Sequence, residues 1–210
     1  MKKVLVLVVL FVSSVMAAQD MEVTKGDFNF LKDQKEINVE FLYGNLKLFK
    51  ENKADAQYVA ERTAELNEKT KGVGTAWAKK WYSSRDLSFE PKFLELVNIV
   101  LTKDKKELSF QEGLKDSKYT LIVDLEWVYP GYNVVMAKKG AKVSTVLKFV
   151  ETTNRNNVVL AIKSDEAPGD VFGGSFSNED RIAEGFAKTG KSLAKLILKR
   201  AYKDTIPQSV

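Results

Sequence analysis

Two acidic residues on one segment are the first candidates for chemistry in this sequence. Asp124 and Glu126 stand two residues apart in a run of alternating apolar and polar side chains, which places both carboxylates on the same face of a strand. The strand rise sets them roughly 6–7 Å apart, where one carboxyl group can serve as acid and the other as base in glycoside cleavage. A solvated sheet face also carries such charges, and Lys148 can pair with one of them across the sheet. We favour this second interpretation and keep a carboxylate-dependent glycan hydrolase as the alternative.

The sequence contains no histidine and no cysteine. It therefore has no Ser-His-Asp triad, histidine metal site, thiolate nucleophile, disulfide or zinc ribbon. Asp165, Glu166 and Asp170 lack EF-hand spacing and indicate an acidic turn. The run Gly173-Gly174-Ser175 matches neither the Walker pattern nor GxGxxG. We expect no catalytic residue, no metal and no cofactor.

Two tryptophans provide a candidate binding surface. Trp77 and Trp81 are one helical turn apart, so their rings share a face. Exposed rings of this kind can stack on a sugar or a partner protein, whereas rings on the inner stripe of a helix fill the core. Core packing is the commoner role at this spacing, and partner binding is the alternative that we retain.

A lysine row near the C-terminus provides a second candidate surface. Its members are spaced three or four residues apart: Lys188, Lys191, Lys195, Lys199 and Lys203. Such a row can dock on an anionic membrane surface or an acidic protein. The usual alternative is a solvated helix face, and lysines near a helix C-terminus are also favoured by the helix macrodipole.

The first 18 residues have the plan of a signal peptide. Lys2 and Lys3 precede an apolar run that ends at Val12, and small residues lead to Ala18. We expect cleavage after Ala18, with Ala17 as the alternative. The apolar run is about half of the roughly 20 residues that a spanning helix needs, and no later segment is long enough.

A cleaved leader predicts an exported protein, and the Lys2-Lys3 start together with the lack of cysteine favours a bacterial protein that is periplasmic or secreted. Gln19 stands where a lipoprotein would carry cysteine. Loss of Lys2 and Lys3 lowers the net charge from +5 to +3, which does not predict a nucleic-acid binder.

Apolar periodicity sets the expected elements. Alternation predicts strands over 37–43, 119–129, 143–149 and 158–162, with Trp127 on the same side as Leu125 and a hairpin link over 153–157. Helical spacing predicts helices over 54–71, 75–83 and 178–202. Ser177 is the expected cap of the last helix. Residues 93–101 fit a helix, with a strand as the alternative.

Strands with one apolar face need a cover on that face, and amphipathic helices supply it. We therefore expect an α+β fold, in which amphipathic helices pack on one face of a mostly antiparallel sheet and the C-terminal helix is long. The predicted boundaries are a signal peptide over 1–18, a leading arm over 19–36, one domain over 37–203 and a tail over 204–210.

Short runs in the C-terminal half carry a resemblance to known proteins. They are Tyr119-Thr120-Leu121-Ile122-Val123, Tyr129-Pro130-Gly131, Ala141-Lys142-Val143-Ser144, Lys148-Phe149-Val150-Glu151-Thr152, Ala167-Pro168-Gly169 and Arg181-Ile182-Ala183-Glu184-Gly185-Phe186-Ala187-Lys188. Through them, residues 89–203 resemble an exported Bacteroidetes-type family of unknown function. At the level of fold the chain is more distantly similar to envelope modules related to the N-terminal domain of TolB and to the curli secretion lipoprotein.

Members of those envelope groups hold partners in the cell envelope. The resemblance therefore implies an exported, non-catalytic cell-envelope protein that binds a protein or a glycan. It supplies no active-site residues, and the missing lipoprotein cysteine means that it implies no membrane attachment. The sequence alone gives neither the partner nor the oligomeric state.

Overall fold

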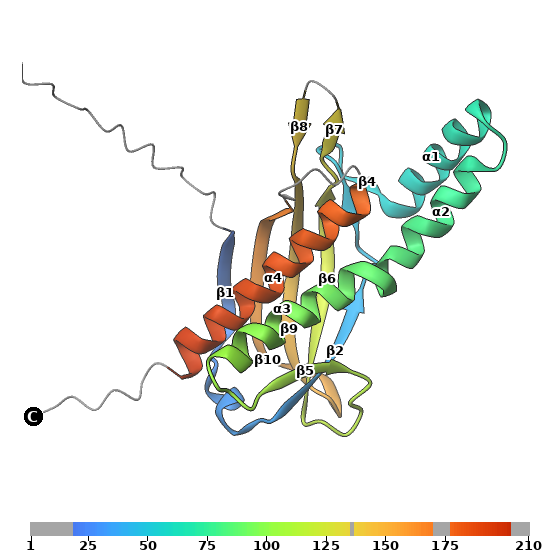
Figure 1. Ribbon diagram of the computed structural model, residues 1–210. Coiled ribbons are helices and arrows are strands. Elements are labelled where there is room, and N and C mark those ends of the chain that lie inside the picture. Colours follow the sequence, from blue (N-terminus) through green and yellow to red (C-terminus); the bar gives the residue numbers. More distant parts are fainter. Residues whose placement is uncertain (1–18, 135–136, 170–176, 203–210) are drawn as a thin grey trace, which may run out of the picture.

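One mixed sheet forms the centre of the protein (Figure 1). The computed structural model describes residues 19–134, 137–169 and 177–202. The sheet has eight strands, with the main order β1-β10-β9-β6-β2-β5. These strands are β1 (Asp20–Gly26), β2 (Glu36–Leu42), β5 (Ser109–Glu112), β6 (Tyr119–Tyr129), β9 (Ala141–Glu151) and β10 (Asn154–Gly169). The four strands from β1 to β6 in this order pair antiparallel, whereas β2 runs parallel to both β6 and β5.

Four short strands complete the β structure of the described residues, two within the main sheet and two in a separate hairpin. β3 (Lys47–Leu48) pairs with β6 and with β4 (Lys53–Ala54). β7 (Tyr132–Val134) and β8 (Ala137–Lys139) form a separate hairpin that projects beyond the end of the sheet (Figure 1).

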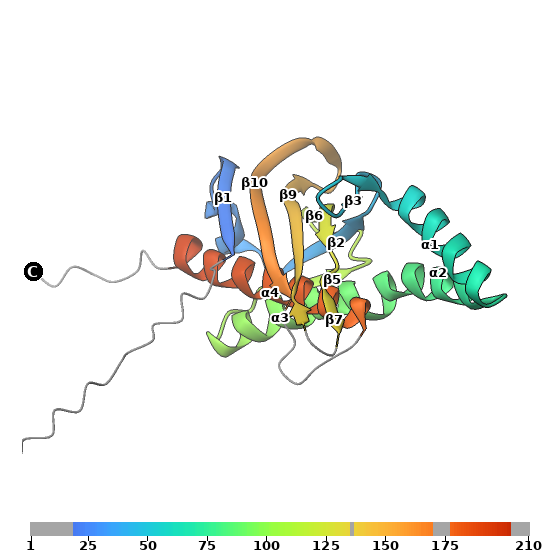
Figure 2. The same cartoon turned by 90° about the horizontal axis from the view of Figure 1, so that it is seen from above.

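The helices divide into a covering pair and a projecting pair. They are α1 (Asp55–Lys69), α2 (Val73–Ser84), the π-helical turn η2 (Arg85–Phe89), α3 (Glu90–Lys103) and α4 (Asn178–Ala201), with a 3-10 turn η1 at Asn29–Asp33. α3 and α4 lie side by side on one face of the sheet. α1 and α2 instead form a hairpin that extends away from the sheet (Figure 2). The long C-terminal helix and its expected cap are confirmed, since the Ser177 side chain accepts a hydrogen bond from the Asp180 amide.

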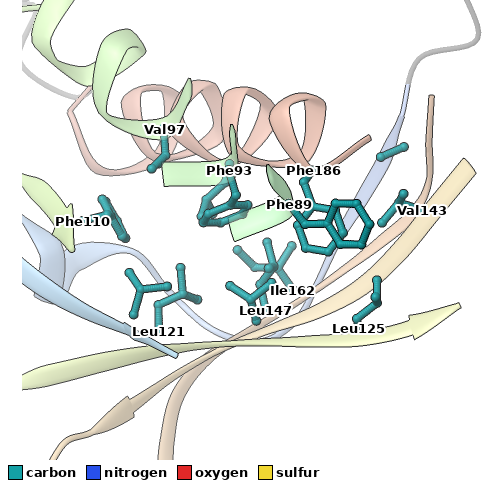
Figure 3. Close-up of a cluster of buried hydrophobic side chains, with 14 of the residues drawn as sticks. Phe89, Phe93, Val97, Phe110, Leu121, Leu125, Val143, Leu147, Ile162 and Phe186 are labelled. Carbon is teal, nitrogen blue, oxygen red and sulfur yellow. The ribbon is translucent and has the colours of Figure 1, made fainter. Parts of the chain in front are cut away.

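The hydrophobic core lies between α3, α4 and the sheet (Figure 3). Phe93 and Phe186 from the helices belong to the same core cluster as Leu147 and Phe149 from the sheet, and all four are fully buried. Residues 93–101 belong to α3, so the helix is the correct alternative for that segment. The α+β fold predicted from alternating strands and amphipathic helices is confirmed. α1 and α2 are the exception to the expected cover.

Three local expectations are wrong, each because backbone pairing overrides the local pattern. Residues 20–26 of the expected leading arm form the edge strand β1, whose Val23 pairs with Ile162. Asn154 already pairs with Glu151, so the β9–β10 turn is shorter than the link expected over 153–157. A register shift between Leu125 and Trp127 places Val128, which is 1% exposed, in the core and turns Trp127 to the opposite face of the sheet.

None of the helices in the described part of the chain is both long enough and apolar enough to cross a membrane.

Gly190 sets the distance between the two covering helices. A Cβ added at Gly190 would lie 2.4 Å from the backbone oxygen of Phe93. That atom belongs to the α3 backbone and cannot move alone, so only glycine permits this close crossing.

We predict that Gly190→Ala lowers the free energy of unfolding by about 1–3 kcal/mol, because the helices must separate and loosen the core. Gly44→Ala is the matched control, since nothing lies within 4 Å of a Cβ added there. Urea unfolding of both variants measures the effect. Equal losses, or a stable Gly190→Ala variant, would contradict the packing argument.

Candidate functional site

The two carboxylates singled out by their spacing do not face one cavity. Asp124 is only 4% exposed, so the expected solvated position is wrong for this residue. The predicted pairing with Lys148 is confirmed, with the Lys148 Nζ donating to Asp124 Oδ2 at 3.4 Å. The second oxygen, Oδ1, has no hydrogen-bond partner among the described residues. Glu126, two residues further along the same strand, instead lines a hollow in the protein surface.

This hollow lies on the sheet face opposite to α3 and α4 and has a volume of about 700 Å³. We call it the outer hollow, and its lining residues are Asn45, Lys47, Asn52, Glu126, Trp127, Ser144, Lys163, Asp165 and Glu166. They come from β3, β6, β9, β10 and the turns beside β3. The opposite end of the same face is covered differently, because β10 curves over it (Figure 2) and Arg155 pairs with Glu40 of β2. The guanidinium of Arg155 holds the pKa of the Glu40 carboxyl below its usual range.

Two β-bulges shape the outer hollow. In β6 the extra residue is Glu126, because Leu125 pairs with Thr145 while Trp127 pairs with Ser144. In β10 the register shifts between Ser164 and Ala167, which leaves Asp165 and Glu166 opposite one residue of β9. Glu166 adopts a positive φ of 48°, and its amide donates to Ser144 Oγ at 3.0 Å. Bulges of this kind re-aim side chains, and here they bring carboxylates from two strands to one surface.

The acidic run is therefore part of a strand and not of the expected turn. Asp165 and Glu166 lie in β10, and Asp170 lies outside the described residues. No group of three or more acidic side chains in the described part of the chain is arranged to hold a metal ion. The sequence contained the acidic residues but no signal for the bulge that directs them.

Some charges of the outer hollow are paired and others are open. Lys163 Nζ lies 2.9 Å from Asp165 Oδ2, and the hydrogen bond raises the pKa of the lysine. Glu166 pairs with Lys142. Glu126 and Lys47 form no ion pair with any described residue, so both remain available to a ligand.

Trp127 is the one aromatic residue among those that line the outer hollow. Its indole Nε1 donates to the backbone oxygen of Phe49 at 2.7 Å, and its ring stacks on Tyr129 with centroids 6.5 Å apart. These contacts fix the ring while leaving it partly exposed. Sequence reasoning missed this residue because unbroken alternation would have buried it.

The tryptophans singled out earlier lie at the base of the α1–α2 hairpin. Trp81 is 2% exposed and donates through Nε1 to Asp55 at 2.9 Å, so its ring is part of the core. Trp77 stacks on Trp81 with centroids 5.8 Å apart and keeps a partly exposed ring. Core packing therefore describes Trp81, and partner binding by Trp77 stays a prediction.

Asp55 also anchors a partly buried polar cluster beside Trp81. Arg85 Nη2 lies 2.6 Å from Asp55 Oδ2, and its guanidinium stacks over the rings of Tyr43 and Tyr82. Tyr43 donates its hydroxyl to Glu90 at 2.9 Å. This cluster joins the helical hairpin to β2 and to the start of α3.

The lysine row is on the surface of α4. Lys191, Lys195 and Lys199 are exposed and Lys188 is partly exposed, whereas Lys203 lies outside the described residues. The row and the outer hollow lie on opposite sides of the sheet, since α4 packs on the face that the hollow does not use.

Comparison with known proteins identifies no family. No protein-family model matches the chain, and no curated protein matches it significantly. The PelC dodecamer from Paraburkholderia phytofirmans aligns with 82% of this chain and 96% of its own, at 13% identity and a TM-score of 0.38. A PelC variant from the same organism aligns over 84% and 97%, at 11% identity and a TM-score of 0.34. Both TM-scores are too low to establish a shared fold.

The buried carboxyl of Glu90 predicts a pH effect on stability. Burial raises the pKa of this group, so the folded chain holds the proton more tightly than the unfolded chain does. The contribution of Glu90 to stability therefore falls as pH rises from about 4 through the raised pKa.

Glu90→Gln removes that titration while keeping an acceptor for Tyr43. The free energy of unfolding of the wild type, relative to this variant, should decrease between about pH 4 and pH 7. Urea unfolding of both proteins at several pH values measures this difference in free energy. The other carboxyl groups titrate alike in the two proteins, so their contributions cancel from it. A difference that stays constant over this range would contradict the assignment.

Proposed function

We propose that this protein is an exported, non-catalytic binding module of the bacterial cell envelope, and that the outer hollow binds a saccharide. The leader-like start of the sequence and the resemblance to envelope proteins support export. The composition of the outer hollow supports the choice of ligand. Its Trp127 ring beside amide, carboxylate and ammonium groups is the observation that carries the proposal.

Saccharides need this combination of groups. The C–H face of a sugar ring packs on an aromatic face, while its hydroxyl groups donate to carboxylates and accept from amides and ammonium groups. In the outer hollow, Glu126 supplies an open carboxylate, Lys47 an open ammonium, and Asn45 and Asn52 supply amides. An apolar ligand would leave these groups without partners, which costs binding energy.

The shape of the hollow also suits a sugar unit of a longer chain. A volume of about 700 Å³ falls within the range of small-molecule sites. The hollow is open to solvent along the sheet surface, so a polymer can cross it without its ends being enclosed.

The alternative of a glycan hydrolase has less support. It required Asp124 and Glu126 to share one cleft, but only Glu126 lines the outer hollow. Asp124 is buried with Lys148 and lies outside the lining. A binding function needs no such pair.

Glu126→Ala should weaken saccharide binding by about 10- to 100-fold, because hydrogen bonds to a charged group are lost. A glycan array bearing bacterial surface polysaccharides, N-acetylglucosamine oligomers and muropeptides first identifies a bound glycan, and titration calorimetry then compares the variants. Tyr132→Ala is the control, since Tyr132 is an exposed aromatic outside the hollow. Absence of any bound glycan, or equal binding by Glu126→Ala and the wild type, would contradict the proposal.

Export has a separate test in the N-terminus of the protein recovered from cells. We expect the mature chain to begin at Gln19, or at Ala18 if cleavage follows Ala17. N-terminal sequencing of the periplasmic and secreted fractions measures this. A chain that keeps Lys2 and Lys3 and stays in the cytoplasm would contradict export.

A further inference from the structure

The exposed face of α4 carries cations that the protein itself does not neutralise. Lys188, Lys191, Lys195 and Lys199 form no ion pair with any residue in the described part of the chain. Several other lysines do have an acidic partner, as Lys80 has in Glu179. We propose that this α4 lysine row docks the protein on an anionic lipid bilayer.

The row is straight and rigid. Its spacings of three and four residues keep all four side chains within one narrow stripe of the helix, and the stripe is about 17 Å long from the helix rise. The packing of α4 on the sheet fixes this geometry, because Phe186, Leu193 and Ile197 on the inner side are fully buried. Four ammonium groups are thus presented together without loss of helix order on binding.

Acidic residues do not interrupt the row. α4 contains no Asp or Glu after Glu184, and Arg200 adds another exposed cation. On the neighbouring α3, Glu95 is already paired with Lys92. Asp27 lines a hollow together with Lys199 and Arg200 and is the acidic neighbour at the end of the row. It forms no ion pair with either cation among the described residues, so the exposed face of α4 keeps an excess of positive charge from Lys188 to Arg200.

A bilayer suits this surface better than an acidic protein does. A lysine stripe on a helix that lies flat can reach many lipid headgroups at one level, with ammonium groups at the phosphates and alkyl stems against the interface. Ile99 of α3, which lies beside α4, is 38% exposed and offers a limited apolar contact. The inner stripe of α4 is occupied by the core, so binding is mainly electrostatic and must be sensitive to salt.

Docking by α4 would also orient the molecule. The outer hollow opens on the other side of the sheet, so it would face away from the lipid. The docking surface and the proposed saccharide site are therefore independent and can be tested apart.

The test is co-sedimentation of the mature chain with vesicles of phosphatidylglycerol and phosphatidylcholine, or of phosphatidylcholine alone. We expect binding only to the anionic vesicles, with loss at high salt. Each lysine near an anionic surface contributes about fivefold to partitioning. The triple variant Lys191→Glu, Lys195→Glu and Lys199→Glu should therefore bind at least about 100-fold more weakly.

The matched control is the triple variant Lys50→Glu, Lys71→Glu and Lys79→Glu. These lysines are also exposed and none of them belongs to α4, and the net charge changes equally. Circular dichroism checks that both variants fold, and the triple change of the α4 row to arginine should keep binding.

Equal loss in both glutamate variants would overturn the proposal, because net charge alone would then explain binding. Equal binding of the wild type to neutral vesicles would overturn it too. Retention on immobilised polyglutamate without any binding to anionic vesicles would assign the row to an acidic protein instead.

Discussion

The contact between the α3–α4 pair and one face of the sheet is the constraint on which the other features depend. It uses the apolar stripe of α4 and the inner side chains of the central strands, so neither is available to a partner. What remains exposed is the polar face of α4 on one side and the outer sheet face on the other. The lysine row and the outer hollow lie on the two surfaces that this one buried interface leaves exposed. Gly190 permits the close approach that holds the layer together.

The regular parts of the fold could be predicted because their periodicity reflects burial directly. Leu121 and Val123 alternate with polar or less buried side chains along β6 as the core requires, and the apolar stripe of α4 faces the sheet. The edge strand β1 could not be predicted in the same way. Its residues are mostly exposed and its place depends on pairing with β10, a long-range contact that local sequence does not encode.

The candidate site escaped prediction for a different physical reason. Glu126 was identified as a chemical group, but a one-residue bulge reverses which neighbours face the core, and alternation beyond it points the wrong way. Trp127 was therefore assigned to the interior, although it lines the outer hollow. Lysines of the α4 row were easier to place, because a helix that must cover a sheet has only one face left for them.

The strand connectivity of the sheet has a consequence for biosynthesis. Val23 in the first strand pairs with Ile162, and β2 pairs with β5 and β6, which come much later in the chain. An incomplete chain emerging from the ribosome therefore has no partner for its opening strands, and contacts so distant in sequence form slowly. The polypeptide stays open until most of it has been synthesised. Such delayed closure keeps the chain unfolded for the time that the proposed export would require.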